Sequence, residues 1–272
     1  MSSSDSAHTE ARMLSLAAGT VLDISPPDAI AAAAQAGWTA AGVWYDPATW
    51  TPAVTADVQR RLADTGLIAL DIEPVIFGRD DHHGPAIIDI AAQIGARFVL
   101  VASGPASRSE VVDELGTLAA LAARAAPALT LVLEFLPIFT IGRLDAAAGI
   151  IAELSCANLG VLVDTLHLAR SGGSPEELGA YAPALFPYLQ LADALATPAD
   201  DSRAGLRDEA LHGRLLPGDG GLPLTDTLRT IPNVAISVEL RSRGLMALYP
   251  DPVERARVVL DATKAVVERA DE

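Results

Sequence analysis

Four oxygen-bearing side chains stand at the ends of short apolar runs in the second half of the chain. Glu134 closes LVLE, Asp164 closes VLVD, Gln190 lies in YLQL and Glu239 closes ISVE. Runs of this kind are typical of buried parallel strands. Because the carboxyl ends of all strands of a βα barrel meet at one face, we expect these side chains to converge. A single strand-end carboxylate often caps a helix or pairs with an Arg, but four in consecutive strands favour one shared site.

Three carboxylates and one amide oxygen are suited to one hard divalent cation, Mg²⁺ or Mn²⁺. Zinc is less favoured, because the set contains no Cys or His. Three negative ligands around a divalent ion leave about one net negative charge on the cluster. A carboxylate in such a cluster keeps enough basicity to move a proton, while the cation polarises a substrate carbonyl or hydroxyl. The set therefore predicts a Lewis acid and a base in one site.

Strand-like runs alternate with Ala-rich helical stretches along the chain, which predicts repeated βα units and a parallel sheet. Ser25 before Pro26 and Asp251 before Pro252 are typical helix starts. The eight expected strands are 14–18, 41–44, 68–73, 98–102, 131–135, 160–164, 188–192 and 234–239. Eight strands in 272 residues favour a single (β/α)8 TIM barrel. A doubly wound sheet more often carries a Gly-rich phosphate motif after its first strand, and none is present.

The barrel is expected over residues 13–272, after a polar and flexible N-terminal tail over residues 1–12. The tail has no apolar signal-peptide core, and no stretch approaches the length needed to cross a membrane. Cys156 is the single cysteine, so an intramolecular disulfide and a thiolate metal cluster are excluded. These features predict a cytoplasmic protein with no membrane partner.

The charge balance argues against nucleic acid as a partner. The chain has 19 Lys and Arg against 35 Asp and Glu, a formal net charge of −16, which would repel a phosphate backbone. A small anionic substrate stays open if a metal ion and local Arg residues reverse the potential inside the site. The oligomeric state also stays open, with a homo-oligomer among the options.

The longest interruption of the βα pattern runs from residue 194 to residue 222, directly after the strand that holds Gln190. Connections of this length are often lids or binding loops, although LRDEALHGRL also has the composition of an ordinary inserted helix. If the segment is a lid, His212 and Arg214 are its candidate substrate contacts. Arg241, two residues after Glu239, either reaches the same face or pairs with a surface acid.

Further candidates lie in the first half of the chain. Glu73 ends the third expected strand, and Arg79 in the following FGRDDHH segment is placed to bind a substrate carboxylate or phosphate. The adjacent His82 and His83 fit a solvated loop better than a site. Trp44 ends the second expected strand, where it either walls the site or belongs to the core.

The order Glu, Asp, third ligand, Glu on the last four strands resembles the xylose isomerase-like TIM-barrel superfamily, which includes sugar phosphate isomerases and epimerases. The likeness extends to the run Asp164-Thr165-Leu166-His167 and to the turn 217–220, PGDG. By this resemblance Glu134, Asp164, Gln190 and Glu239 bind one divalent metal. The two glutamates would also exchange a proton with the carbon next to a carbonyl, and His167 would contact the substrate.

Gln190 departs from most epimerases of this family, which have His as the third ligand. A neutral oxygen shifts the expected metal further towards Mg²⁺ or Mn²⁺. Gln at this position is similar to a second branch, the bacterial 3-dehydroshikimate dehydratases. Both reactions begin by removing a proton next to a ketone, and they differ in whether the proton returns or a hydroxyl leaves.

The first interpretation is therefore a metal-dependent isomerase or epimerase of a small keto sugar or polyol, phosphorylated or not. The alternative is a lyase of the 3-dehydroshikimate dehydratase kind, acting on a hydroxyketone acid. Two Arg residues converging in the site would favour the lyase, because such a substrate needs a carboxylate anchor. A non-catalytic accessory or sugar-binding protein is the third interpretation, and an intact pair of glutamates argues against it.

Overall fold

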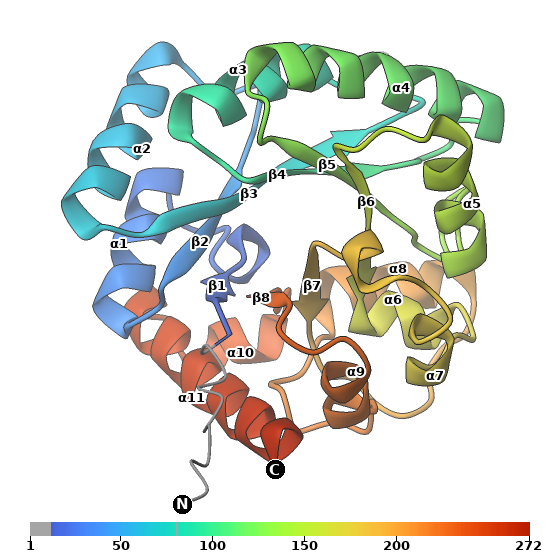
Figure 1. The fold of residues 1–272 in the computed structure, drawn as a ribbon. Coiled ribbons are helices and arrows are strands. Elements are labelled where there is room, and N and C mark those ends of the chain that lie inside the picture. The colour runs from blue at the N-terminus through green and yellow to red at the C-terminus, as the bar shows by residue number, and fades with distance from the viewer. Residues whose placement is uncertain (1–11, 80) are drawn as a thin grey trace, which may run out of the picture.

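Eight parallel strands close into a barrel in sequence order in the computed structural model, which describes residues 12–79 and 81–272 (Figure 1). This architecture confirms the predicted TIM barrel. The strands are β1 (Leu14–Leu16), β2 (Ala40–Trp44), β3 (Ile68–Ile76), β4 (Phe98–Ala102), β5 (Thr130–Glu134), β6 (Leu159–Asp164), β7 (Tyr188–Leu191) and β8 (Ala235–Val238).

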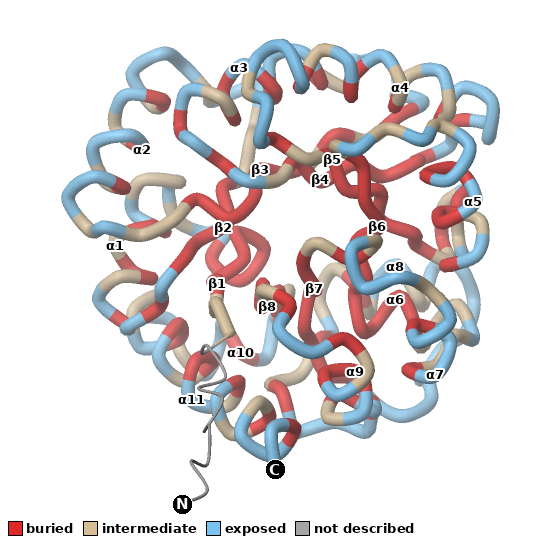
Figure 2. Tube along the Cα trace, in the orientation of Figure 1, coloured by how far each residue is buried: buried red, intermediate tan, exposed pale blue. Residues whose placement is uncertain are grey.

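Helices surround the barrel and cover its outer face (Figure 1). The larger ones are α1 (Pro26–Ala36), α2 (Pro52–Thr65), α3 (Gly84–Ile94), α4 (Arg108–Ala125), α5 (Leu144–Leu154), α8 (Arg203–His212) and α11 (Pro252–Asp271). Shorter elements are the 3-10 turns η1 (Ala18–Thr20) and η2 (Pro183–Leu185) and the helices α6 (Thr165–Arg170), α7 (Pro175–Leu178), α9 (Leu224–Thr230) and α10 (Arg243–Leu248). Burial is concentrated on the strands and on the inward faces of the helices (Figure 2).

All eight expected strands are present, with small shifts at their ends. The first strand stops at Leu16 instead of Ala18, because the chain turns there into η1. The third strand continues to Ile76, because its last residues pair with Val101 and Ala102 of β4 after a register shift. Glu239 lies one residue beyond β8.

The register of the barrel brings the predicted site residues to one end. Asp164 pairs with Gln190, and Gln190 pairs with Ser237, two residues before Glu239. Paired residues of parallel strands share one face of the sheet, so the side chains of Asp164 and Gln190 lie next to each other. On the opposite side of the barrel, Trp44 pairs with Glu73.

The tail expected over residues 1–12 lies outside the described residues, apart from Arg12. The Arg12 guanidinium donates to the carbonyl of Leu228 over 3.2 Å and lies 3.1 Å from Asp271. Among the helices of residues 12–79 and 81–272, we find none that is long and apolar enough to cross a membrane.

Helix α11 tests how much a predicted cap contributes to stability. Asp251 Oδ1 accepts hydrogen bonds from the backbone N–H groups of Val253 and Glu254 at 2.8 and 2.9 Å. We expect Asp251→Ala to lower the free energy of unfolding by about 1 kcal/mol, the usual cost of losing an N-cap. Urea denaturation measures this, with Asp261→Ala in the exposed middle of α11 as the control. An equal loss in both variants would contradict the capping account.

Candidate active site

The candidate active site is a cavity of about 350 Å³ at the carboxyl ends of the strands. Glu134 at the end of β5, Gln190 in β7 and Glu239 just after β8 line it, together with His167 of α6. Asp164 is the last residue of β6, pairs with Gln190 of β7 and is fully buried. The structure thus places all four predicted ligands at one end of the barrel.

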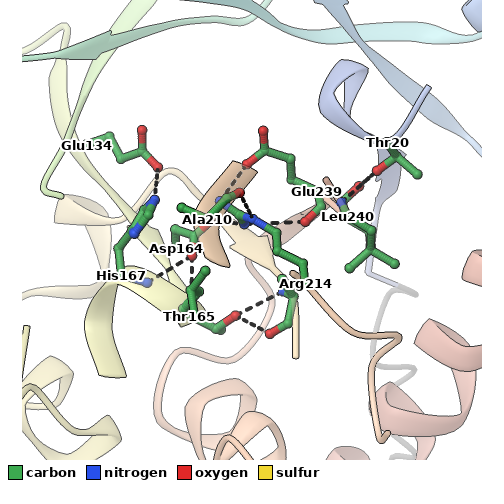
Figure 3. Close-up of polar contacts among 12 residues, drawn as sticks. Thr20, Glu134, Asp164, Thr165, His167, Ala210, Arg214, Glu239 and Leu240 are labelled. Carbon is green, nitrogen blue, oxygen red and sulfur yellow. Dashed lines mark hydrogen bonds and ion pairs between the residues drawn. The ribbon is translucent and has the colours of Figure 1, made fainter. Parts of the chain in front are cut away.

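Arg214 connects two of these carboxylates. Its Nη1 lies 2.5 Å from Asp164 Oδ2, and its Nη2 lies 3.0 Å from Glu239 Oε2 (Figure 3). Although burial alone would raise the pKa of Asp164, the Arg214 guanidinium, helped by His167, holds it below its ordinary value. The carboxylates in turn outweigh burial and raise the pKa of Arg214. Asp164 is therefore ionised, and Arg214 carries a fixed positive charge at the base of the cavity.

Asp164 has a second role as the N-cap of α6. Its Oδ1 accepts from the backbone N–H groups of Leu166 and His167 at 2.8 and 3.0 Å. The cap fixes the first turn of α6, and this turn carries His167 towards Glu134. One carboxylate therefore orients both Arg214 and His167.

Glu134 and His167 form the second polar pair of the site. His167 Nε2 lies 3.7 Å from Glu134 Oε1, and both side chains are buried (Figure 3). Burial, followed by the charges of Asp164 and Glu239, raises the pKa of Glu134 well above its ordinary value. Burial lowers the pKa of His167 to about 4, so this imidazole is neutral at pH 7. The pair therefore places a carboxyl group with a raised pKa beside a neutral ring.

Glu239 is supported from the β1 side of the barrel. Thr20 Oγ1 donates to the carbonyl of Val238 over 2.8 Å and accepts from the N–H of Leu240 over 2.8 Å, so it holds the chain on both sides of Glu239 (Figure 3). The side chain of Glu239 lies directly against Gly19, where an added Cβ would overlap its Oε1. η1 therefore both positions Glu239 and leaves room for it.

The long segment after β7 brings Arg214 into the cavity. Its helix α8 contributes Arg207, Ala210 and Leu211 to the lining. Arg214 Nε donates to the carbonyl of Ala210 over 3.0 Å, which ties the guanidinium to the end of α8. The inward position expected for Arg214 is observed. His212 is not brought to the cavity, because its Nδ1 lies 2.8 Å from Asp208 on the outer side of α8.

The remaining candidates from the sequence line the cavity. Trp44, Glu73, Arg79 and Arg241 all contribute to its walls. The guanidinium of Arg241 lies 5.2 Å from the centre of the Trp44 ring, a cation–π arrangement and not a pairing with a surface acid. Glu73 is buried, and burial, with the charges of Glu239 and Asp71, raises its pKa well above the ordinary value.

Sequence reasoning missed three features of the site. Arg207 faces the cavity, but only the placement of α8 reveals it. Asp193 organises the glycine turn of the long segment: its carboxylate accepts from the N–H groups of Ala194, Gly218, Gly220 and Leu222. The signal was the PGDGG turn, whose free N–H groups need an acceptor. The third feature is an interior pair in which Tyr188 Oη donates to Asp71 Oδ2 over 2.9 Å and burial raises the pKa of Asp71 to about 6.

The donor set fits a divalent cation. One carboxylate oxygen each of Glu134 and Asp164 and a ring nitrogen of His167 all lie within 4.8 Å of one another. The Oε1 and Nε2 atoms of Gln190 are buried, and neither has a hydrogen-bond partner among the described residues. A buried amide without partners is costly, and ligation through Oε1 would satisfy the oxygen. This grouping adds His167 to the donors expected from the sequence, while Glu239 contacts Arg214, which also binds Asp164.

The chain belongs to the xylose isomerase-like TIM barrel family, whose model matches residues 30–266. No curated protein matches the sequence.

Solved structures share the fold at low sequence identity. A xylose isomerase-like TIM barrel/4-hydroxyphenylpyruvate dioxygenase fusion protein has a TM-score of 0.82 at 19% identity; the match covers 95% of this chain and 43% of that protein. The IOLI protein with a binding zinc atom has a TM-score of 0.81 at 18% identity, covering 95% and 99% of the two chains. The probable 3-DHS dehydratase AsbF of Bacillus anthracis has a TM-score of 0.70 at 14% identity, covering 91% and 98%. A D-psicose 3-epimerase has a TM-score of 0.71 at 16% identity, covering 93% and 99%.

The lowered pKa of His167 predicts a specific pH dependence of stability. The unfolded chain binds a proton at this residue below about pH 6.5, whereas the folded chain binds it only near pH 4. Acidification through this range therefore favours unfolding of the wild-type protein, and His167→Gln should lose this component.

Urea denaturation of protein treated with a chelator, measured at several pH values, gives the comparison. His212→Gln on the outer side of α8 is the matched control and should keep the wild-type pH dependence. Parallel pH profiles for the wild type and His167→Gln would show that burial of His167 does not keep it neutral.

Proposed function

We propose that this chain is a divalent-metal-dependent enzyme that removes a proton next to a substrate carbonyl. We further propose that its substrate is a hydroxyketone acid from which it eliminates water, in the manner of a 3-dehydroshikimate dehydratase. The observation that carries this proposal is the pairing of two buried glutamates with four arginines around one cavity. Arg79, Arg207, Arg214 and Arg241 all line it.

The arginines favour an anionic substrate. Arg214 is already held by Asp164 and Glu239, but Arg207 and Arg241 form no ion pair with a described carboxylate. Arg79 and Arg207 are exposed at the cavity, whereas Arg241 is half-buried over Trp44. Guanidinium groups bind carboxylates through paired hydrogen bonds, so a substrate carboxylate has suitable partners here. A neutral ketose would leave these charges unused.

The two glutamates are suited to opposite proton-transfer roles. Glu239 Oε2 lies 3.0 Å from Arg214 Nη2 at the cavity, where this side chain is placed to accept the proton from the carbon next to the carbonyl. Glu134 is the second buried carboxyl group at the cavity, and in its protonated form it is placed to give a proton to the leaving hydroxyl. The neutral His167 ring beside Glu134 can orient that carboxyl group and contact the substrate.

Glu134, Asp164, Gln190 and Glu239 would hold the cation, with His167 as a further nitrogen donor. When bound, a divalent cation supplies Lewis-acid polarisation of the substrate carbonyl. Oxygen ligands favour Mg²⁺ or Mn²⁺, whereas ligation by His167 would bring zinc within range. The zinc in the IOLI structure makes this a distinction to measure.

Epimerisation of a keto sugar is the second candidate function. Glu134 and Glu239 are both buried at the same cavity, and a pair of carboxyl groups is what removal and return of a proton on two faces requires. The shared fold with a D-psicose 3-epimerase is consistent with it. The arginines favour the lyase over epimerisation of an unphosphorylated sugar.

A substrate screen separates the two reactions. The protein, loaded with Mg²⁺, Mn²⁺ or Zn²⁺ in turn, is incubated with 3-dehydroshikimate and with free and phosphorylated ketoses. We expect the hydroxyketone acid to lose water and give a product with a new conjugated double bond, which ultraviolet absorbance detects. We also expect deuterium from D₂O to enter this substrate at the carbon beside its carbonyl. Epimer formation without alkene would replace the lyase with the epimerase, and absence of exchange with every compound would remove both.

Variants separate proton transfer from metal binding. Glu134→Gln and Glu239→Gln each keep an oxygen donor, so turnover should fall by roughly 10²- to 10⁴-fold while metal is retained. Asp164→Asn keeps an acceptor for the α6 cap but removes a charged ligand. The affinity of Asp164→Asn for Mn²⁺ should fall by at least roughly 10- to 100-fold, because replacing a residue that only supports a metal ligand already costs this much.

Turnover assays and calorimetric titration with Mn²⁺ measure the two effects, and Glu177→Gln on the exposed face of α7 is the control. If Asp164→Asn bound Mn²⁺ as tightly as the wild type, the assigned ligand set would be wrong.

A further inference from the structure

A second cavity, of about 680 Å³, lies beside the candidate active site and is here named the side cavity. It opens at the same end of the barrel, because its walls follow β1 and β2: residues 18–29 on one side and residues 42–57 on the other. Trp44 and Arg241 line both cavities, so these two side chains form their common boundary.

Apolar and aromatic side chains make up much of the lining of the side cavity. Val21, Leu22, Ile24, Pro26, Pro27 and Val54 contribute hydrophobic surface, and Trp44 and Trp50 contribute rings. Leu22 is 39% exposed and adds apolar surface to this cavity. The cavity therefore offers contact area to an apolar ligand.

The polar groups of the side cavity already have partners. Asp57 pairs with Arg60 over 2.8 Å, and Asp46 accepts from the N–H of Ala48 over 2.9 Å. Trp50 Nε1 donates to Thr55 Oγ1 over 3.0 Å, and its ring packs on Tyr45 with a centroid distance of 5.5 Å. Trp50 is consequently held in place as a wall, and the acids are not available as a cation site.

We propose that the side cavity is a substrate subsite that binds an aromatic substituent on the non-reacting end of the substrate. Arg241 lies at the boundary, where its guanidinium can pair with the carboxylate of the hydroxyketone acid while the substituent extends into the side cavity. The reacting hydroxyketone occupies the smaller cavity with the glutamates. The physiological substrate is then larger than a monocyclic hydroxyketone acid.

Assignment of the side cavity to the substrate rests on the proposed function, but ligand binding there does not. A binding probe therefore tests the cavity itself. The probe is 1-anilinonaphthalene-8-sulfonate, an aromatic anion whose fluorescence rises in apolar surroundings. We expect saturable binding to one site per chain.

A blocking variant shows where the probe binds. Thr49 is exposed and lines the side cavity, so Thr49→Trp should fill it and weaken probe binding by about ten-fold or more. Thr117→Trp makes the same change on the exposed face of α4, away from both cavities, and should bind the probe as the wild type does. If Thr49→Trp fails to fold, Leu22→Glu at the same cavity repels the anionic probe and replaces it. Unchanged probe binding in a folded blocking variant, or no saturable binding to the wild type, would overturn the proposal.

Turnover then connects the cavity to the reaction. Two hydroxyketone acids that differ by one aryl substituent are compared in the wild type, Thr49→Trp and Thr117→Trp. We expect the aryl compound to have the higher kcat/KM in the wild type and in Thr117→Trp, and to lose this advantage in Thr49→Trp. If neither compound exchanges a proton, the proposed function is wrong, and the probe experiment still shows whether the side cavity binds an aromatic ligand. If both react equally in all three proteins, the subsite assignment fails alone.

Discussion

Negative charge buried inside one end of the barrel is the constraint on which the rest of the site depends. Glu73, Glu134, Asp164 and Glu239 are all buried there. Burial and mutual repulsion raise the pKa of Glu73 and of Glu134 well above ordinary values, so these groups resist carrying charge together. Buried carboxylates persist only with compensating cations or hydrogen bonds. Arg214 provides one such cation for Asp164 and Glu239, and a divalent ion is the natural partner for the others.

The position of Arg214 in turn depends on the segment after β7. Asp193 and Leu215 form a two-way backbone bridge, with N···O distances of 3.2 and 2.8 Å. The Asp193 carboxylate holds the following glycine turn, and Arg170 of α6 fixes α8 through two 2.7 Å contacts with Glu209. Arg214, the residue before Leu215, therefore has little conformational freedom. The segment that lines the site through α8 also supplies its buried cation, so a movement of this segment would remove Arg214 from Asp164 and Glu239.

The sequence predicted those parts of the molecule that depend on local pattern. Buried parallel strands read as runs of Val, Leu and Ile, and strand ends meet by topology, so β1 to β8 and the convergence of Glu134, Asp164, Gln190 and Glu239 followed without coordinates. Features made by packing between distant segments did not follow. The link from Arg214 to Asp164 and Glu239, the inward face of α8 with Arg207, and the outward turn of His212 all depend on how one long connection docks. No periodicity in that connection specifies its docking.

The two halves of the barrel contribute different chemistry. The carboxyl ends of β5 to β8 carry the titratable groups and the amide of Gln190, whereas the segments after β1 and β2 carry apolar and aromatic walls. Trp44 and Arg241 lie where these two regions meet. Under the proposed function, proton transfer uses only the first region, so changes in the β1 and β2 segments would alter which substituent is accepted while the glutamates and Arg214 stay in place. The proposed anionic substrate is compatible with a net charge of −16, because the arginines at this boundary and on α8 lie in the cavity itself, whereas charges on the distant surface are screened by salt.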